Sequence, residues 1–178
     1  AMNQGYEVVE TILGRDVRPA DHPLFEEKFR ALPFGLDVDA TLHLIQSRVP
    51  LYREINPLQF REFMLGSQVV RPETGAAIFR RNDYTDTFFV VLDGEVEIEL
   101  GDETPYRLKL GAGQFFGEMG LFHDQPTRSA WVRTRNACEL AEMTYPRFRQ
   151  IAAESPGLIF ELATQLATRL DRTNRKLG

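Results

Sequence analysis

The spacing of hydrophobic residues changes along the chain, and the change predicts a β-rich middle between helical ends. Before residue 66, apolar side chains recur three or four residues apart, as they do over 24–32 and 42–45. This is the spacing of amphipathic helices. Asp21-His22-Pro23 and Asn56-Pro57 each place a capping residue before a proline, which is a common helix start. We therefore expect a helix to follow each of these segments.

From Gly66 onward, short runs of apolar residues are separated by turn residues. Along one run the apolar and acidic residues alternate, with Glu95, Glu97 and Glu99 on the face opposite the apolar side chains. This pattern predicts a half-buried strand with a solvated row of glutamates. Further strands are expected over 69–72, 76–80, 88–92, 106–110, 129–134 and 139–144. Such short strands predict a mainly β fold, a jelly-roll-like antiparallel barrel with flanking helices.

The C-terminal part, 146–178, is predicted to be helical, with the last helix starting at Ser155-Pro156. In that helix one seam follows a strict 4-3 spacing and consists of Ile159, Ala163, Leu166, Leu170, Thr173 and Leu177. A seam of this kind is typical of two-stranded coiled coils, so we expect a homodimer through the C-terminal helix. Leu158 and Leu162 lie to one side of the seam and are candidates to face the barrel.

This pattern divides the chain into a helical N-terminal extension and one larger domain. The extension covers 1–40 and has no assigned role, and the domain covers 41–178, with its barrel over about 66–145. A chain of 178 residues with 43% hydrophobic and 26% charged residues has the composition of an ordinary globular protein.

Charge and cysteine content narrow the function classes further. The net charge of −5 disfavours a nucleic-acid-binding domain, which is usually basic. The single cysteine, Cys138, cannot form an internal disulfide and is expected as a buried filler, which fits a reducing, cytoplasmic setting. We expect neither a membrane span nor a secretory signal. The three histidines lack the spacing of a metal site, and no catalytic constellation is evident.

The candidate chemistry lies in the connection between residues 115 and 132. Its Gly117-Glu118 step combines a residue that permits close backbone approach with a carboxylate that can accept from a hydroxyl. Eleven residues after Gly117, Arg128 offers a fork of donors that suits a phosphate. A cyclic nucleotide carries both groups. The spacing equally allows an ion pair between Glu118 and Arg128 that only holds a surface loop in place.

A resemblance to a known family favours the ligand-binding interpretation. Gly117-Glu118-Met119-Gly120-Leu121-Phe122 and the later Arg128-Ser129-Ala130-Trp131-Val132-Arg133 resemble the phosphate-binding cassette of the cyclic-nucleotide-binding domain superfamily. Within that superfamily the chain is most similar, from about 49 to 178, to the sensory domain of the bacterial cAMP receptor proteins. The resemblance implies a regulatory domain, not an enzyme, that binds cAMP, with cGMP also possible, and moves its C-terminal helix in response.

The resemblance also implies roles for single residues. Gly117 and Glu118 would bind the edge of the ribose that carries the 2′-hydroxyl, and Arg128 with Ser129 would bind the cyclic phosphate. Thr173 would read the adenine, and Asn174 replaces a serine that the family takes from the partner subunit. The predicted ligand-binding set is Phe116, Gly117, Glu118, Met119, Arg128, Ser129, Ala130, Thr173 and Asn174.

Two neighbouring residues are expected to play no part in binding. Arg169, which could lie near the pocket, is expected on a solvated helix face, and Trp131, which could serve as a stacking platform for a base, is expected to be buried in a strand.

The family's regulator continues into a helix-turn-helix domain beyond the position that corresponds to Gly178. We therefore expect the effector domain or partner to lie outside this chain, and no nucleic-acid binding by the chain itself. Two alternatives stay open. One is a dimerisation module that keeps the fold and senses no nucleotide, and the other is a sensor of a different small anion.

Overall fold

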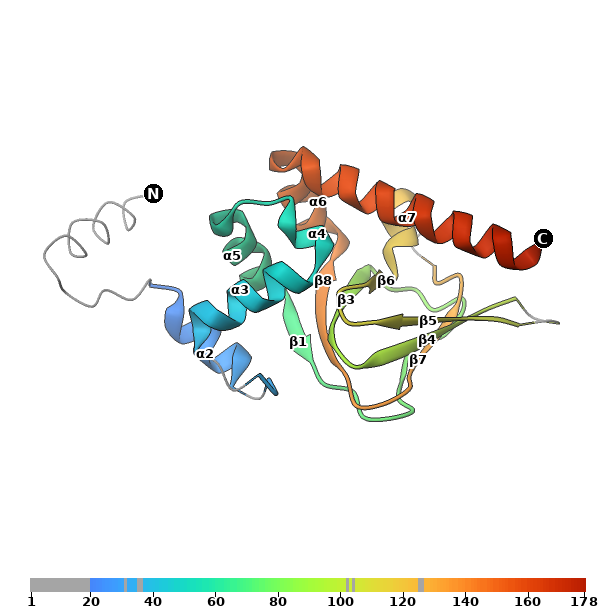
Figure 1. Ribbon diagram of the computed structural model, residues 1–178, viewed down its shortest axis with the longest axis horizontal. Helices are drawn as coiled ribbons and strands as arrows, with labels where there is room; N and C mark the ends of the chain where they lie inside the picture. Colours follow the sequence, from blue (N-terminus) through green and yellow to red (C-terminus); the bar gives the residue numbers. More distant parts are fainter. Residues whose placement is uncertain (1–19, 31, 35–36, 102, 104, 125–126) are drawn as a thin grey trace, which may run out of the picture. The chain divides into compact units, whose positions relative to one another are not determined.

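The computed structural model describes residues 20–178, apart from 31, 35–36, 102, 104 and 125–126 (Figure 1). The described residues fall into two compact units, one ending at Thr41 and the other beginning at Leu42. Residues 1–19 of the predicted N-terminal extension lie outside the described residues. The helices are α2 (His22–Phe29), α3 (Val38–Arg48), α4 (Pro50–Arg53), α5 (Pro57–Gly66), α6 (Tyr145–Glu154) and α7 (Pro156–Leu177).

The helix starts predicted from capping residues and prolines are confirmed. α2 begins at His22, directly after Asp21, and α7 begins at Pro156. At α5 the cap is complete, because the Asn56 side chain accepts from the Gln59 backbone N–H at 2.8 Å. The Gln59 side chain accepts in turn from the Asn56 N–H at 3.3 Å, so two otherwise unpaired donors of the first turn are satisfied.

Eight strands, counted over the described residues, form two four-stranded sheets in which all pairings are antiparallel. The strand order is β1-β8-β3-β6 in the first sheet and β2-β7-β4-β5 in the second. The strands are β1 (Gln68–Val70), β2 (Ala77–Phe79), β3 (Thr87–Asp93), β4 (Glu95–Leu100), β5 (Tyr106–Gly111), β6 (Phe115–Phe116), β7 (Trp131–Thr134) and β8 (Glu139–Thr144). The predicted jelly-roll-like fold with flanking helices is therefore confirmed.

The run of apolar residues in β3 is buried on both faces of its sheet, which explains its lack of alternation. Phe89 points into the core between the sheets, where it stacks on Phe116 at 5.1 Å between ring centroids. Its neighbour Phe88 points the other way and packs edge-on against Phe148 of α6 at 4.9 Å. Cys138 lies in the inter-sheet core as predicted. The strand thus joins the sandwich to the helices that cover it.

The long helix α7, red at the C-terminal end of the chain in Figure 1, runs past the strands on the side of β6. Leu158 and Leu162, the two residues of this helix that were candidates to face the barrel, are fully buried. The face of α7 that carries them therefore points inward. No helix in the described part of the chain is long and apolar enough to cross a bilayer.

The outer face of the second sheet differs from prediction, because its glutamates are paired rather than solvated. Arg135 contacts Glu95 at 2.9 Å and Glu97 at 2.8 Å, and Arg107 contacts Glu99 at 3.1 Å. The glutamates of β4 lie between two basic neighbours, since β5 supplies Arg107 and the end of β7 leads into Arg135. The row is a ladder of ion pairs across three strands.

Trp131 also departs from prediction, because it is 38% exposed. Alternation along β7 turns its neighbour Val132 into the core and Trp131 to the outer face. There the Arg80 guanidinium lies 5.4 Å from the centre of its ring. The tryptophan is therefore a partner for a surface cation, and it does not line the cavity described below.

Candidate ligand-binding site

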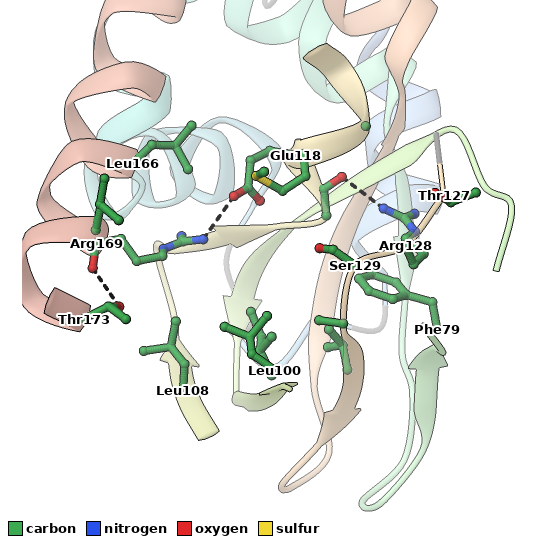
Figure 2. Close-up of a pocket in the computed structure, with 17 residues that line it drawn as sticks. Phe79, Leu100, Leu108, Glu118, Thr127, Arg128, Ser129, Leu166, Arg169 and Thr173 are labelled. Atoms are coloured by element: carbon green, nitrogen blue, oxygen red, sulfur yellow. Dashed lines mark hydrogen bonds and ion pairs between the residues drawn. The ribbon is translucent and has the colours of Figure 1, made fainter. Parts of the chain in front are cut away.

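A cavity of about 320 Å³ lies between the second sheet, the connection that follows β6, and helix α7 (Figure 2). This volume is at the lower end of the range for small-ligand sites. Seven of the nine predicted binding residues line it: Gly117, Glu118, Met119, Arg128, Ser129, Ala130 and Thr173. Phe116 does not line the cavity, because it is buried in the core against Phe89. Asn174 also lies outside the lining, on the exposed side of α7.

The connection turns into the cavity at Gly117, which has φ +81°. An L-amino acid rarely adopts this backbone conformation. A β-carbon at this position would also lie 2.7 Å from Nη1 of Arg128. The short helical turn Glu118–Phe122 starts immediately afterwards. Both the backbone and the arginine thus require glycine here, and the turn holds Glu118 inward.

Arg128 is 5% exposed and is bound by uncharged oxygens. Its Nη1 donates to the Gly117 carbonyl at 3.0 Å and to the Tyr145 hydroxyl at 3.1 Å, and its Nη2 donates to the carbonyl and hydroxyl of Thr87. The guanidinium carbon lies 4.1 Å from the ring centre of Phe79. The Nε atom is buried without a hydrogen-bond partner. In the described part of the chain no carboxylate forms an ion pair with Arg128. The guanidinium is therefore held in place, and its charge can bind an anionic ligand.

Burial lowers the pKa of Arg128, while Tyr145, Glu142 and Glu118 act in the opposite direction. Its ordinary pKa is so high that the group stays a cation at neutral pH. Arg128 thus places a rigid positive charge at the end of the cavity formed by the connection that follows β6.

Glu118 pairs with Arg169 of α7, not with Arg128, as Figure 2 shows. Nη1 of Arg169 lies 3.3 Å from the Glu118 carboxylate, and Nη2 donates to the Phe115 carbonyl at 2.6 Å. Burial raises the pKa of Glu118, and Arg169 and, to a smaller extent, Arg128 lower it. The loop-holding Glu118–Arg128 ion pair that spacing allowed is therefore wrong.

The expectation that Arg169 lies on a solvated helix face is also wrong. Its side chain is only 19% exposed, and it lines the cavity. The sequence contained a signal for this position, because Arg169 follows the buried Leu162 by seven residues, about two helical turns, and so shares its inward face. A buried carboxylate at Glu118 also needs a counter-charge.

The far end of the cavity is apolar. Ile98, Leu100 and Leu108 line it from the sheet, and Leu166 and Leu170 line it from α7. The Thr173 hydroxyl lies beside them and donates to the Arg169 carbonyl at 3.0 Å, which leaves its oxygen free to accept. The cavity therefore suits a ligand with an anionic, hydroxyl-bearing end and a flat apolar end.

The predicted seam on α7 divides between two roles. Leu166, Leu170 and Thr173 line the cavity, although Leu170 is also 62% exposed, whereas Ile159 is 41% exposed and Ala163 is exposed; neither of these two lines the cavity. Phe160, which the seam did not include, is 77% exposed. Ile159, Phe160 and Ala163 form an apolar strip on the helix surface.

The comparison with protein families agrees with this geometry. Residues 69–155 match the family model described as "Cyclic nucleotide-binding domain". The cAMP-activated global transcriptional regulator CRP of Salmonella typhimurium is 35% identical over 106 residues, which cover 58% of this chain and 50% of the regulator. Vfr of Pseudomonas aeruginosa, with the same description, is 36% identical over 109 residues, covering 58% and 51%. The chain thus spans about half the length of these relatives.

Solved structures share the fold. The c-di-GMP responsive global regulator CLP of Xanthomonas campestris is 33% identical, with a TM-score of 0.61 over 68% of this chain and 63% of that one. The catabolite activator protein of Thermus thermophilus is 25% identical, with a TM-score of 0.62 over 72% and 61%. CRP and Vfr are both described as cAMP-activated global transcriptional regulators.

Proposed function

Because this chain belongs to the cyclic-nucleotide-binding domain family and is homologous to the sensory domain of bacterial cAMP-activated regulators, we propose that it binds cAMP and transmits binding through α7. The observation that carries the proposal is the pair of opposite charges at one end of an apolar cavity. Arg128 is buried with no carboxylate partner among the described residues, and Glu118 is buried on the same connection.

The cyclic phosphate would bind beside Arg128. Its guanidinium is already positioned by Gly117, Tyr145 and Thr87, so little side-chain entropy is lost when a phosphate arrives. The unpartnered Nε adds a donor. Ser129 borders the same part of the cavity and supplies a hydroxyl. A charge-assisted hydrogen bond of this kind contributes about 1.5–3 kcal/mol.

The ribose 2′-hydroxyl would donate to Glu118, and the base would lie between the leucines and isoleucine of the sheet and α7. Thr173 would accept from an exocyclic amino group such as that of adenine, since its own proton is donated to the Arg169 carbonyl. Asn174 lies outside the cavity of its own chain. In this proposal it reaches a base only from a second copy.

Signal transmission would depend on the Glu118–Arg169 pair. Arg169 is carried by α7, so its ion pair joins the helix to the binding connection. A ribose hydroxyl at Glu118 adds a competing donor and changes which position of α7 is favoured. This is a population shift between helix positions.

A homodimer through α7 belongs to the same proposal. Ile159, Phe160 and Ala163 expose an apolar strip that a second copy would cover. Phe160→Glu should make the protein monomeric in sedimentation analysis, whereas Arg133→Glu, at an exposed position of β7 outside the strip, should not. The effector domain or partner, in a cytoplasmic setting, would lie outside this chain.

Isothermal titration with cAMP, cGMP and the linear 5′-AMP tests the ligand. We expect micromolar binding of cAMP, weaker binding of cGMP and no detectable binding of 5′-AMP. Arg128→Ala should lose about 100-fold in cAMP affinity, the equivalent of about 2.7 kcal/mol. No binding of any cyclic nucleotide to protein shown to be folded would contradict the proposal and favour the dimerisation module without a ligand.

A cyclic dinucleotide is the second candidate, because CLP is described as c-di-GMP responsive. The cavity of about 320 Å³ favours one nucleotide over two. Titration with c-di-GMP in the same series separates the candidates, since tighter binding of c-di-GMP than of cAMP would replace the mononucleotide assignment.

A further inference from the structure

A second concave surface lies on the other flank of α7, between this helix, β5 and the turn that follows β5. Its volume is about 780 Å³, more than twice that of the cavity next to Glu118. The two share only Leu108, Arg169 and Thr173. The cyclic-nucleotide assignment does not use this groove.

The groove is strongly basic in an acidic protein. Six of the 21 lysines and arginines of the chain line it, together with one acidic residue, Glu161. The six are Arg48, Lys109, Arg169, Arg172, Arg175 and Lys176. Over the residues that the structure describes, the groove lining therefore carries +5, and the remaining residues of the sequence carry −10 to give the total of −5.

Some cations of the groove already form an ion pair with a carboxylate of the protein, and others do not. Arg169 is bound to Glu118, and Arg175 lies 2.9 Å from Asp171. By contrast, Lys109, Arg172 and Lys176 have no hydrogen bond or ion pair with any described residue. The one carboxylate, Glu161, accepts from Gln165 at 2.7 Å.

The helix dipole explains only part of this arrangement. Cations in the last turn of α7 interact favourably with its C-terminal carbonyls, which accounts for Arg175 and Lys176. It does not account for Lys109, which lies on β5, or for Arg48 at the end of α3. Charges from three separate elements line one concave surface, where like charges repel one another.

We propose that this groove binds a small ligand that carries two or more phosphates, as a nucleoside diphosphate does. Phosphate oxygens would satisfy Lys109, Arg172 and Lys176 together and remove their repulsion. A long polyanion such as a nucleic-acid strand fits less well, because the residues outside the groove have a net charge of −10 in the sequence.

The proposed site stays open in a dimer formed through the apolar strip. At about 100° per residue, Arg172 lies about 140° around α7 from Ile159 and about 120° from Phe160, so it faces away from the strip. Arg169 and Thr173 border both the groove and the cavity. A ligand in the groove thus contacts the same helix as a ligand in the cavity.

Titration calorimetry with inorganic pyrophosphate and with ADP, at about 0.15 M salt, tests the site on the full chain. We expect Lys109→Gln combined with Arg172→Gln to weaken pyrophosphate binding about tenfold or more. The matched control is Arg30→Gln combined with Arg133→Gln, which removes the same charge from exposed positions outside the groove and should leave affinity unchanged. Tighter binding of ADP than of pyrophosphate would assign the site to nucleotides, and the reverse would assign it to inorganic phosphates.

Three results would overturn the proposal. Equal losses in the two double variants would show only general attraction to cations. Loss of pyrophosphate binding in Arg128→Ala would place the anion in the cavity instead. Tighter binding of a single-stranded oligonucleotide than of pyrophosphate, lost in the groove variant, would make the surface a nucleic-acid site. Because the groove variants leave Arg128 and Glu118 intact, failure here does not affect the cAMP assignment.

Discussion

The two arginines of the cavity are held in different ways by the regions that carry them. Arg128 comes from the connection before β7 and is bound by uncharged oxygens from residues 87, 117 and 145, which lie far apart in the sequence. Arg169 comes from a helix and is bound by a carboxylate and a backbone carbonyl, both from the segment 115–118. Arg128 is therefore part of the sandwich, whereas Arg169 links helix α7 to the sandwich.

This difference indicates which part of the site is fixed and which can change. Removing Arg128 takes away a donor from the carbonyls of Gly117 and Thr87 and from the Tyr145 hydroxyl, so the sandwich itself depends on it. Arg169 has a single charged partner, and a ligand that also engages Glu118 competes for it. A sensor needs both properties, a rigid point of capture and a contact that ligand binding can alter.

The largest effect should come from comparing the two arginines in the protein without ligand. We expect Arg128→Ala to lower the free energy of unfolding by about 3 kcal/mol, because the carbonyls of Gly117 and Thr87 and the Tyr145 hydroxyl lose their shared donor. Arg169→Ala should cost about 1 kcal/mol, since its site is partly hydrated. Urea unfolding measures both. Equal losses would contradict the distinction between a built-in and a movable cation.

A smaller effect should come from the glycine that Arg128 approaches. Gly117 and Gly75 have nearly the same φ, +81° and +79°, but a β-carbon at Gly117 would touch Arg128 whereas Gly75 faces open space. Both alanine variants should lose about 1 kcal/mol to backbone strain. Only Gly117→Ala should also displace the guanidinium, with about a tenfold loss of cAMP affinity in calorimetry. If the Gly75→Ala variant lost affinity equally, the contact with Arg128 would be irrelevant to binding.

The sequence predicted this fold well because the fold depends on local patterns. Strand alternation, the glycines at turns and the cap at Asn56 are each visible within a few residues. β6 escaped prediction because its two residues, Phe115 and Phe116, are too few to show a period. Phe116 was accordingly assigned to the ligand, although the strand pairing turns it into the core.

The site was predicted in part, because its cassette is contiguous and its helix contribution is not. Gly117, Glu118, Arg128 and Ser129 lie within thirteen residues, and the cavity brings them together. Arg169 lies 51 residues from Glu118, and only the packing of α7 shows that they meet. The ion pairs of Glu95, Glu97 and Glu99 were missed for the same reason, since strand order determines which arginines face them.

The pH dependence of cAMP binding should distinguish the effect of Arg169 on Glu118 from that of the ribose hydroxyl. Burial raises its pKa above the ordinary 4.5, and Arg169 lowers it. A ribose hydroxyl donates to the ionised form, so cAMP affinity should fall as pH falls through this raised pKa. In Arg169→Ala the pKa should rise further, and the fall should begin at a higher pH. Calorimetry from about pH 7.5 to about pH 5 measures it. Glu118→Gln is the control and should show weak binding that does not change with pH.

The smallest effect should come from two buried tyrosines, whose replacement by phenylalanine should change the stability in opposite directions. Tyr145 donates to the Gly117 carbonyl and accepts from Arg128, whereas the hydroxyl of the fully buried Tyr52 has no hydrogen-bond partner among the described residues. Tyr145→Phe should therefore cost about 1 kcal/mol of stability and about threefold in cAMP affinity, because Arg128 loses one of its supports. Tyr52→Phe removes an unsatisfied polar atom, so it should stabilise the protein by about 1 kcal/mol without a change in affinity. Both variants delete a hydroxyl oxygen from a buried ring. If both changed the free energy of unfolding in the same direction, burial of the hydroxyl, and not its support of Arg128, would determine the effect.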